Sequence, residues 1–159
     1  MAEYSANAAQ TILPGASAIF TATPVPDSTG YIYHRDESGL FRLASPSKIL
    51  GRTFSGCRCN RRMLSAIYDV ALHGNIAIPT GGTAGEISIA IAIDGTSDPS
   101  SLMIVTPAAV GDFFNVGADI SVAVPAICGC ESVSIINTSD QPIVLQNANL
   151  KIRYDKVTY

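Results

Sequence analysis

Apolar and polar residues alternate with a period of two along much of this chain. Between Glu86 and Asp94, isoleucine occupies every second position and serine or alanine stands between. A β-strand produces this spacing, because its successive side chains point to opposite faces. Short β-branched and aromatic runs, separated by Gly, Pro, Asn, Asp and Ser, are typical of an all-β sandwich or barrel. The predicted strands are Ser17–Thr23, Tyr31–His34, Leu40–Leu43, Met63–Leu72, Glu86–Asp94, Leu102–Val105, Ala118–Val124, Glu131–Asn137 and Ile143–Tyr154.

Two of these strands have well-defined faces. The small residues Ser88, Ala90 and Ala92 share the face opposite the isoleucines, which suits close approach of another sheet or subunit. In the last strand the pattern assigns two sets of side chains to opposite faces. One set is Leu145, Asn147, Asn149, Lys151 and Arg153, and the other is Val144, Gln146, Ala148, Leu150, Ile152 and Tyr154.

Turn signals set the limits of these strands. Asp94-Gly95, directly after the isoleucine strand, is the strongest hairpin signal. In Thr106–Phe114 the threonine could cap a helical turn and the following proline could begin it. We predict a structured loop for this segment instead. Because no repeat or linker divides the chain, residues 1–159 are expected to form one domain. Residues 1–14 are predicted either as an anchoring arm or as an ordinary edge strand.

The composition points to association with a partner. The chain has 159 residues, of which 47% are apolar and only 14% are charged. About a quarter of the residues are charged in an average soluble domain. A chain short of charge is expected to hide some of its surface against other subunits.

The charge distribution and hydropathy exclude two partner classes. Ten basic and thirteen acidic residues give a net charge of −3, and no basic stripe that would suit nucleic acid is present. No apolar run is long enough to span a bilayer, and the first residues lack the features of a secretory signal. We therefore expect synthesis in the cytoplasm and no membrane partner.

No residues form a recognisable catalytic set. Asp69 and His73 resemble an acid–base pair, but on a strand they would lie about 13 Å apart, too far for a hydrogen bond. His34 is expected to be structural or solvated. The glycine-rich residues 79–85 lead into a strand, whereas phosphate-binding loops lead into a helix. Asn137-Thr-Ser139 matches the glycosylation acceptor pattern and is predicted as a turn after a strand. The prediction is a protein with no enzymatic activity and no cofactor.

The four cysteines form two Cys-x-Cys pairs, Cys57 with Cys59 and Cys128 with Cys130. The thiols of one pair would point the same way on a strand, with Cα atoms about 6.6 Å apart. Three states are compatible with this pattern. The first is four reduced thiols, favoured when no secretory signal is present. The second is a pair of disulfides between strands, and the third is a four-thiolate zinc site with unusual spacing.

Several stretches together resemble small proteins of Gram-positive gut bacteria and their phages, which are similar to the tumour-necrosis-factor-like jelly roll. The fold also occurs at the C-terminus of collagen-like spore-coat glycoproteins. The stretches are Tyr4-Ser-Ala-Asn-Ala-Ala-Gln-Thr11, Gly39-Leu-Phe41, Gly74-Asn-Ile-Ala-Ile-Pro-Thr-Gly-Gly-Thr83, Ile104-Val-Thr-Pro-Ala-Ala109, Phe114-Asn-Val116, Val133-Ser-Ile-Ile-Asn-Thr-Ser139 and Gln146-Asn-Ala-Asn-Leu150.

The resemblance implies a two-sheet jelly roll of about ten antiparallel strands that assembles as a homotrimer, with the last strand near the threefold axis. It also implies a structural role on a phage particle, as a capsid decoration or head-fibre knob. Partners would be capsid or fibre proteins, and the location would be the virion surface. The collagen-like stalk of the spore-coat proteins is absent from this chain.

Two binding functions are weighed beside the structural one. Exposed tyrosines at Tyr31 and Tyr33 could stack on a host surface glycan, which predicts a glycan- or receptor-binding module as the alternative. A trimer could also hold an axial ion, although loop aspartates usually close turns. The aspartates considered for this role are Asp94, Asp98, Asp112 and Asp119.

Overall fold

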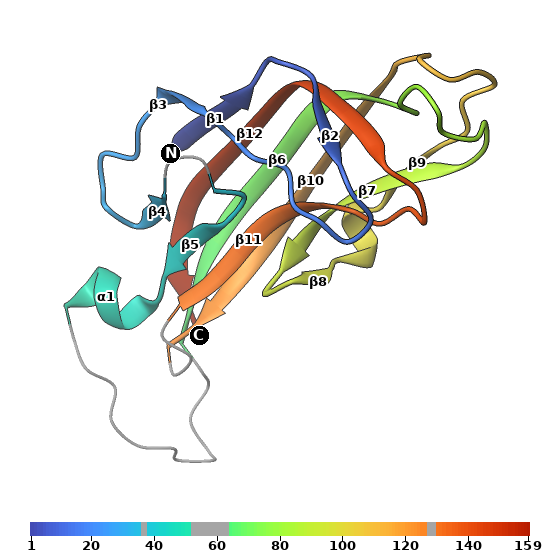
Figure 1. The fold of residues 1–159 in the computed structure, drawn as a ribbon. Helices are drawn as coiled ribbons and strands as arrows, with labels where there is room; N and C mark the ends of the chain where they lie inside the picture. The colour runs from blue at the N-terminus through green and yellow to red at the C-terminus, as the bar shows by residue number, and fades with distance from the viewer. Residues whose placement is uncertain (36–37, 52–63, 127–129) are drawn as a thin grey trace.

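The computed structural model describes residues 1–35, 38–51, 64–126 and 130–159. Two antiparallel sheets pack face to face as a β-sandwich, one of the two all-β arrangements that the alternating pattern predicts (Figure 1). The first, sheet A, has the strand order β10-β6-β12-β1-β3, and β2 pairs with β12. Its strands are β1 (Ala2–Ala6), β2 (Gln10–Ile12), β3 (Ala22–Val25), β6 (Ser65–Ala77), β10 (Phe114–Pro125) and β12 (Ile143–Thr158).

The second, sheet B, has the strand order β4-β5-β11-β7-β8, and β9 pairs with the other end of β7. Its strands are β4 (Ile32–His34), β5 (Phe41–Ala44), β7 (Ile87–Ile93), β8 (Thr96–Ser97), β9 (Met103–Val105) and β11 (Cys130–Asn137). Short helices lie at α1 (Pro46–Leu50) and at the 3-10 turn η1 (Pro99–Ser101). No helix in the described ranges is long and apolar enough to cross a membrane.

The core fills the space between the sheets. Ile87, Ile89 and Ile91 of β7 point inward and are fully buried. The opposite face of β7 is also buried, because Ala90 and Ala92 have no exposed surface within the chain itself. The small side chains of that face were expected to meet another sheet or subunit. A single copy of the chain already covers these two alanines.

The hairpin after β7 forms as predicted. Asp94 and Gly95 have φ angles of 49° and 81°, and β8 pairs back on to β7. Two consecutive positive φ values define the turn that matches the twist of a two-residue hairpin. The segment between β9 and β10 is a loop, also as predicted.

The last strand departs from its predicted faces at one point. A bulge lies between Gln146 and Asn149, where Asn147 has a φ of 50°. An extra residue reverses the alternation of side chains on either side of a bulge. Leu145 is therefore buried and on the inner face, whereas the sequence pattern grouped it with the outward-facing Asn149 and Lys151.

The N-terminal segment is part of the sandwich. β1 pairs with β12 on one side and with β3 on the other. Ala2, Tyr4 and Ala6 are buried in the core. Residues 2–6 are thus neither an edge strand nor a projecting arm, because both of their edges and one of their faces are occupied.

The helix α1 was not predicted, although its signals are present. Pro46 stands at the start of the helix after Ser45, and Gly51 ends it with a φ of 61°. The N–H of Gly51 donates to the carbonyl of Ser47. Proline in the first turn and a left-handed glycine after the last are common helix limits.

Candidate functional site

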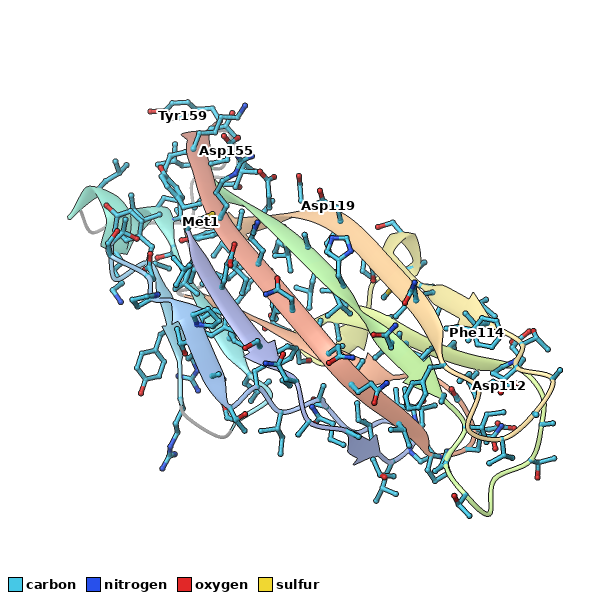
Figure 2. All side chains as sticks on the ribbon, turned by 90° about the horizontal axis from the view of Figure 1, so that it is seen from above. Met1, Asp112, Phe114, Asp119, Asp155 and Tyr159 are labelled. Carbon is cyan, nitrogen blue, oxygen red and sulfur yellow. The ribbon has the colours of Figure 1, made fainter. Side chains whose placement is uncertain are left out.

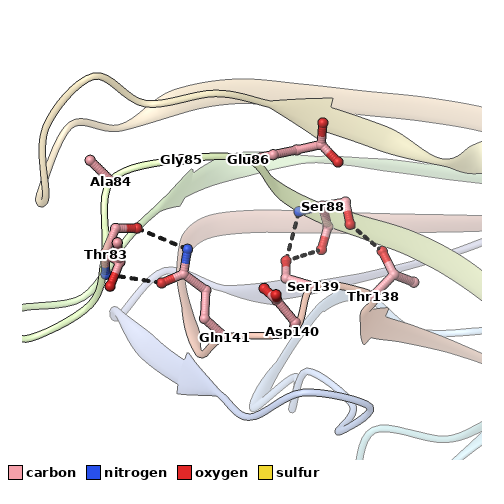
Figure 3. Close-up of a pocket in the computed structure, with 9 residues that line it drawn as sticks. All are labelled: Thr83, Ala84, Gly85, Glu86, Ser88, Thr138, Ser139, Asp140 and Gln141. Atoms are coloured by element: carbon pink, nitrogen blue, oxygen red, sulfur yellow. Dashed lines mark hydrogen bonds between the residues drawn. The ribbon is translucent and has the colours of Figure 1, made fainter.

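A polar hollow opens at one end of the sandwich, between the β6–β7 loop and the β11–β12 loop (Figure 3). It has a volume of about 510 Å³. Its lining is formed by residues 83–86 with Ser88 on one side and by residues 138–141 on the other. Hydroxyl, carboxylate and amide groups line it, whereas aromatic rings do not.

Asn137 fixes the lower loop of this hollow. It is the last residue of β11 and is fully buried. Its amide nitrogen donates to the carbonyl oxygens of Ile12 and Gln141, each at 2.9 Å. Its amide oxygen accepts from the N–H of Ser139 at 2.8 Å. This side chain thus joins the loop to β2. Residues 138–141 form the predicted turn, and a fully buried Asn137 is not an accessible glycosylation acceptor.

Gln141 joins the two loops directly. Its side-chain oxygen accepts from the N–H of Thr83 at 3.1 Å, and its nitrogen donates to the carbonyl of Thr83 at 3.0 Å (Figure 3). The two hydrogen bonds have the same donor and acceptor arrangement as a pair of backbone hydrogen bonds between antiparallel strands. They hold the mouth of the hollow at a fixed width.

Ser88 and Ser139 close the floor of the hollow. The hydroxyl of Ser139 accepts from the N–H of Ser88 at 2.7 Å and donates to its carbonyl at 3.1 Å. The hydroxyl of Thr138 donates to the hydroxyl of Ser88 at 2.7 Å. The hydroxyl positions are therefore set by the fold before any ligand arrives.

Two carboxylates, those of Glu86 and Asp140, also line the hollow and are exposed. Within the described part of the chain neither has an ion pair or a side-chain hydrogen bond. The described residues contain no group of three His, Cys, Asp or Glu side chains that could hold a metal ion. The hollow is therefore a polar site with net negative charge.

The histidines and Asp69 have separate surroundings. The Nε2 of His34 lies 2.9 Å from the carbonyl of Ser38, and its ring stacks on Phe41 with centroids 4.3 Å apart. Asp69 is bound by Arg153, whose Nε and Nη2 lie 3.2 Å and 2.5 Å from one carboxylate oxygen. These hydrogen bonds hold the pKa of Asp69 below its usual value. His73 instead lies against Gly117 on the neighbouring strand.

The remaining predicted site residues are the cysteines and the two tyrosines. Cys57, Cys59 and Cys128 lie outside the described residues, and Cys130 begins β11 opposite Ala44. Tyr31 is partly buried, and its ring packs edge-on against Tyr154 with centroids 5.3 Å apart. The prediction that both tyrosines are exposed is therefore wrong for Tyr31. Tyr33 is 60% exposed.

Two of the aspartates considered for an axial ion have hydrogen-bond partners within the fold. Asp94 accepts from the N–H and hydroxyl of Ser132 at 2.7 and 3.0 Å. Asp98 accepts from the N–H and hydroxyl of Ser100 at 2.8 and 2.7 Å. Asp112 lies in the β9–β10 loop, and Asp119 lies on β10 (Figure 2).

Sequence reasoning missed the hollow as a site. The serine, threonine and glutamine side chains that form it belong to two loops about fifty residues apart, and each loop has the composition of an ordinary turn. The one available signal was the run of four polar residues Thr138-Ser-Asp-Gln141 directly after the predicted strand.

No protein-family model and no curated protein matches this chain. Similarity to solved structures is weak. The sugar-binding C-terminal domain of EclA superposes with a TM-score of 0.34 and 12% identity, over 80% of this chain and 87% of that domain. A GH26-CBM35 β-(1,4)-mannanase of Podospora anserina gives a TM-score of 0.31 and 14% identity, over 95% of this chain and 29% of the mannanase.

A chain of the native virion of Kashmir bee virus gives a TM-score of 0.25 and 12% identity, over 98% of this chain and 71% of that one. All three TM-scores lie below 0.5. Similarity to these structures therefore carries no conclusion about the function of this protein.

Proposed function

We propose that this protein is a non-enzymatic structural protein of a bacteriophage particle, a homotrimeric capsid decoration or head-fibre knob with a tumour-necrosis-factor-like jelly roll. The phage assignment rests on the sequence resemblance described above. The fold rests on strand order, and the assembly rests on one face of the sandwich that no described helix covers.

The strand order supports a jelly roll. β5 lies in sheet B, β6 in sheet A, β7 in sheet B, β10 in sheet A, β11 in sheet B and β12 in sheet A. The chain thus crosses repeatedly between the sheets, and the N-terminal β1 pairs with the C-terminal β12. Repeated crossing between two sheets, with strands distant in sequence as neighbours, is compatible with a double-sheet jelly roll, which is built from Greek keys.

The outer face of sheet A carries the trimer proposal. Its three long strands β12, β6 and β10 lie side by side, and among the described residues no helix covers them (Figure 2). Several side chains that face outward in the middle of this face are small, including Ala71, Gly117 and Ser121. A Cβ added to Gly117 would lie 2.7 Å from Nδ1 of His73, so the histidine ring already occupies that space. Small residues at these positions leave room for a side chain of another subunit.

Charge on this face is largely paired. Lys151 lies 3.0 Å from Glu3, and Arg153 binds Asp69. Each pair joins neighbouring strands of the same sheet. Burial of paired charges costs less than burial of single ones. A second copy can therefore cover the face without leaving these charges uncompensated.

The surroundings of Asp69 and His34 support a non-enzymatic role. Asp69 is bound by Arg153, and His34 lies between a carbonyl group and an aromatic ring. General acid–base catalysis needs such groups to lie within reach of a substrate and of one another. Their contacts are those of side chains that stabilise the fold.

Light scattering after size exclusion tests the assembly. We expect a mass of three times the 16.6 kDa chain. A monomer at micromolar concentration would contradict the trimer. Mass spectrometry of density-purified phage particles tests the virion role, and absence of the protein from the particles would contradict it.

A second function, binding of a host glycan, is favoured by one observation, the polar hollow between the β6–β7 and β11–β12 loops. The tyrosine pair no longer supports it, because Tyr31 packs against Tyr154.

A further inference from the structure

The hollow has the properties of a preformed binding site. Gln141 fixes its width, and the buried Asn137 fixes its lower loop. A ligand would therefore meet polar groups that need little ordering. Pre-organisation of this kind reduces the entropy cost of binding.

The hydroxyl groups leave hydrogen-bonding capacity for a ligand. The hydroxyl of Ser88 accepts from Thr138, and its own proton has no acceptor among the side-chain hydrogen bonds of the described residues. Glu86 and Asp140 provide four carboxylate oxygens, which act only as acceptors when ionised. A ligand with many hydroxyl donors fits this mixture, since carboxylate–hydroxyl bonds are stronger than neutral ones.

An apolar side chain lies beside the hollow. Ser88 of β7 is paired directly with Ile104 of β9. Directly paired residues of an antiparallel sheet share one face, with Cβ atoms about 5 Å apart. Ile104 is 51% exposed. A ligand that fills the hollow and extends past Ser88 would therefore also reach an exposed aliphatic side chain.

We propose that this hollow binds one unit of a neutral or amino-bearing saccharide. A sugar ring carries hydroxyl groups at its edge and C–H groups on its face, which match the hollow and Ile104 respectively. The two carboxylates attract an amino group and repel sialylated, sulfated or phosphorylated sugars. This site lies in a single chain and does not depend on the trimer.

A glycan array with labelled wild-type protein provides the first test. Its panel contains neutral hexose oligosaccharides, N-acetylated and free amino-sugar oligomers, and sialylated and sulfated glycans. We expect signal from neutral or amino-bearing glycans and background from anionic ones. A preference for anionic glycans, or background throughout at high protein concentration, would overturn the proposal.

Titration calorimetry with the best glycan from the array locates the site. Asp140→Lys is expected to weaken binding at least about tenfold, because a cation then replaces an acceptor in the hollow. Asp155→Lys makes the same charge change at the far end of the molecule, where Asp155 is exposed beside Lys156 (Figure 2). We expect this control to bind as the wild type does. Equal loss in both variants would show a net-charge effect and contradict the site.

A second matched pair tests the apolar side. Ile104→Ser is expected to weaken binding about fivefold, whereas Leu102→Ser, two residues earlier and 43% exposed, is expected to leave it unchanged. Equal loss in both would indicate a broad apolar docking surface instead. Light scattering of each variant separates the two proposals. A variant can lose saccharide binding and remain trimeric, or lose the trimer and still bind the saccharide.

Discussion

The side-chain amide of Asn137 donates a hydrogen bond to the carbonyl oxygen of Ile12, 125 residues earlier in the chain, at 2.9 Å. Both residues are buried. The bond connects the end of β11 to β2, and the same amide group also holds the loop that forms one wall of the polar hollow. One side chain thus stabilises the sandwich and shapes the candidate site.

Removal of that amide should destabilise the protein strongly. Asn137→Ala leaves the buried carbonyl of Ile12 without its partner, and we expect the free energy of unfolding to fall by about 2 to 4 kcal/mol. Urea unfolding followed by circular dichroism measures the change. Asn7→Ala, which removes an exposed amide, is the control and should change stability by less than about 0.5 kcal/mol. A loss of similar size in both variants would show that Asn137 has no special role.

If the trimer assembles through sheet A, a bulky charged side chain on the outer face of that sheet should disrupt the trimer, and the same side chain elsewhere should not. Ala71 lies on the outer face of β6, between Asp119 of β10 and Lys151 of β12. Ala71→Arg should convert the trimer to a folded monomer in light scattering, because the new side chain prevents close approach. Thr96→Arg places the same residue on the exposed short strand β8 and should keep the trimer. If Ala71→Arg also remained trimeric, the interface would lie on another surface.

Stability should fall in acid because of Asp27. Burial acts to raise the pKa of Asp27, but hydrogen bonds from the N–H groups of Ile32, Thr29 and Tyr31 and from the Thr29 hydroxyl lower it on balance. A carboxyl group whose pKa is lower in the folded state than in the unfolded state stabilises the fold at pH values above its unfolded-state pKa. This stabilisation is lost as the pH falls through its folded-state pKa.

The variant Asp27→Asn tests this pH dependence. At pH 7 it should be less stable than the wild type, because the amide accepts fewer of these hydrogen bonds. The difference should shrink as the pH falls below about 4, where the wild-type carboxylate becomes protonated. Urea unfolding at pH 7 and at pH 2.5 measures it. A difference that stays constant across this range would contradict the role of the charge.

The phenol of Tyr68 should contribute to stability through one buried hydrogen bond. Its hydroxyl donates to the carbonyl of Ala44 at 2.8 Å, and burial raises the pKa of the phenol. Tyr68→Phe leaves that carbonyl without this donor, which should cost about 1 to 2 kcal/mol in urea unfolding. Tyr33→Phe removes the hydroxyl of an exposed ring and should cost less than about 0.5 kcal/mol. Equal losses of unfolding free energy in the two variants would show that the buried hydrogen bond of Tyr68 contributes no more to stability than an exposed hydroxyl does.

The sequence by itself determined some local elements of this protein, whereas α1 was not predicted and the strand expected at Ser17–Thr23 is not formed over most of its length. The isoleucines of β7 and the Asp94-Gly95 turn predicted a strand and a hairpin, because alternation and positive φ angles depend on adjacent residues only. The same alternation predicted the all-β class, as a sandwich or a barrel. It also assigned most of the inner face of β12.

Tertiary structure decided what depends on residues far apart. The bulge at Asn147 reversed the faces of Leu145 and Gln146, since it arises where β12 pairs with β6. β1 lies inside sheet A because β12 and β3 both pair with it, and its own composition of small and polar residues does not specify those partners. The hollow exists because Gln141 reaches Thr83 and Ser139 reaches Ser88. Side-chain periodicity is a local property, whereas pairing, register and cavities are set by which surfaces the folded chain brings together.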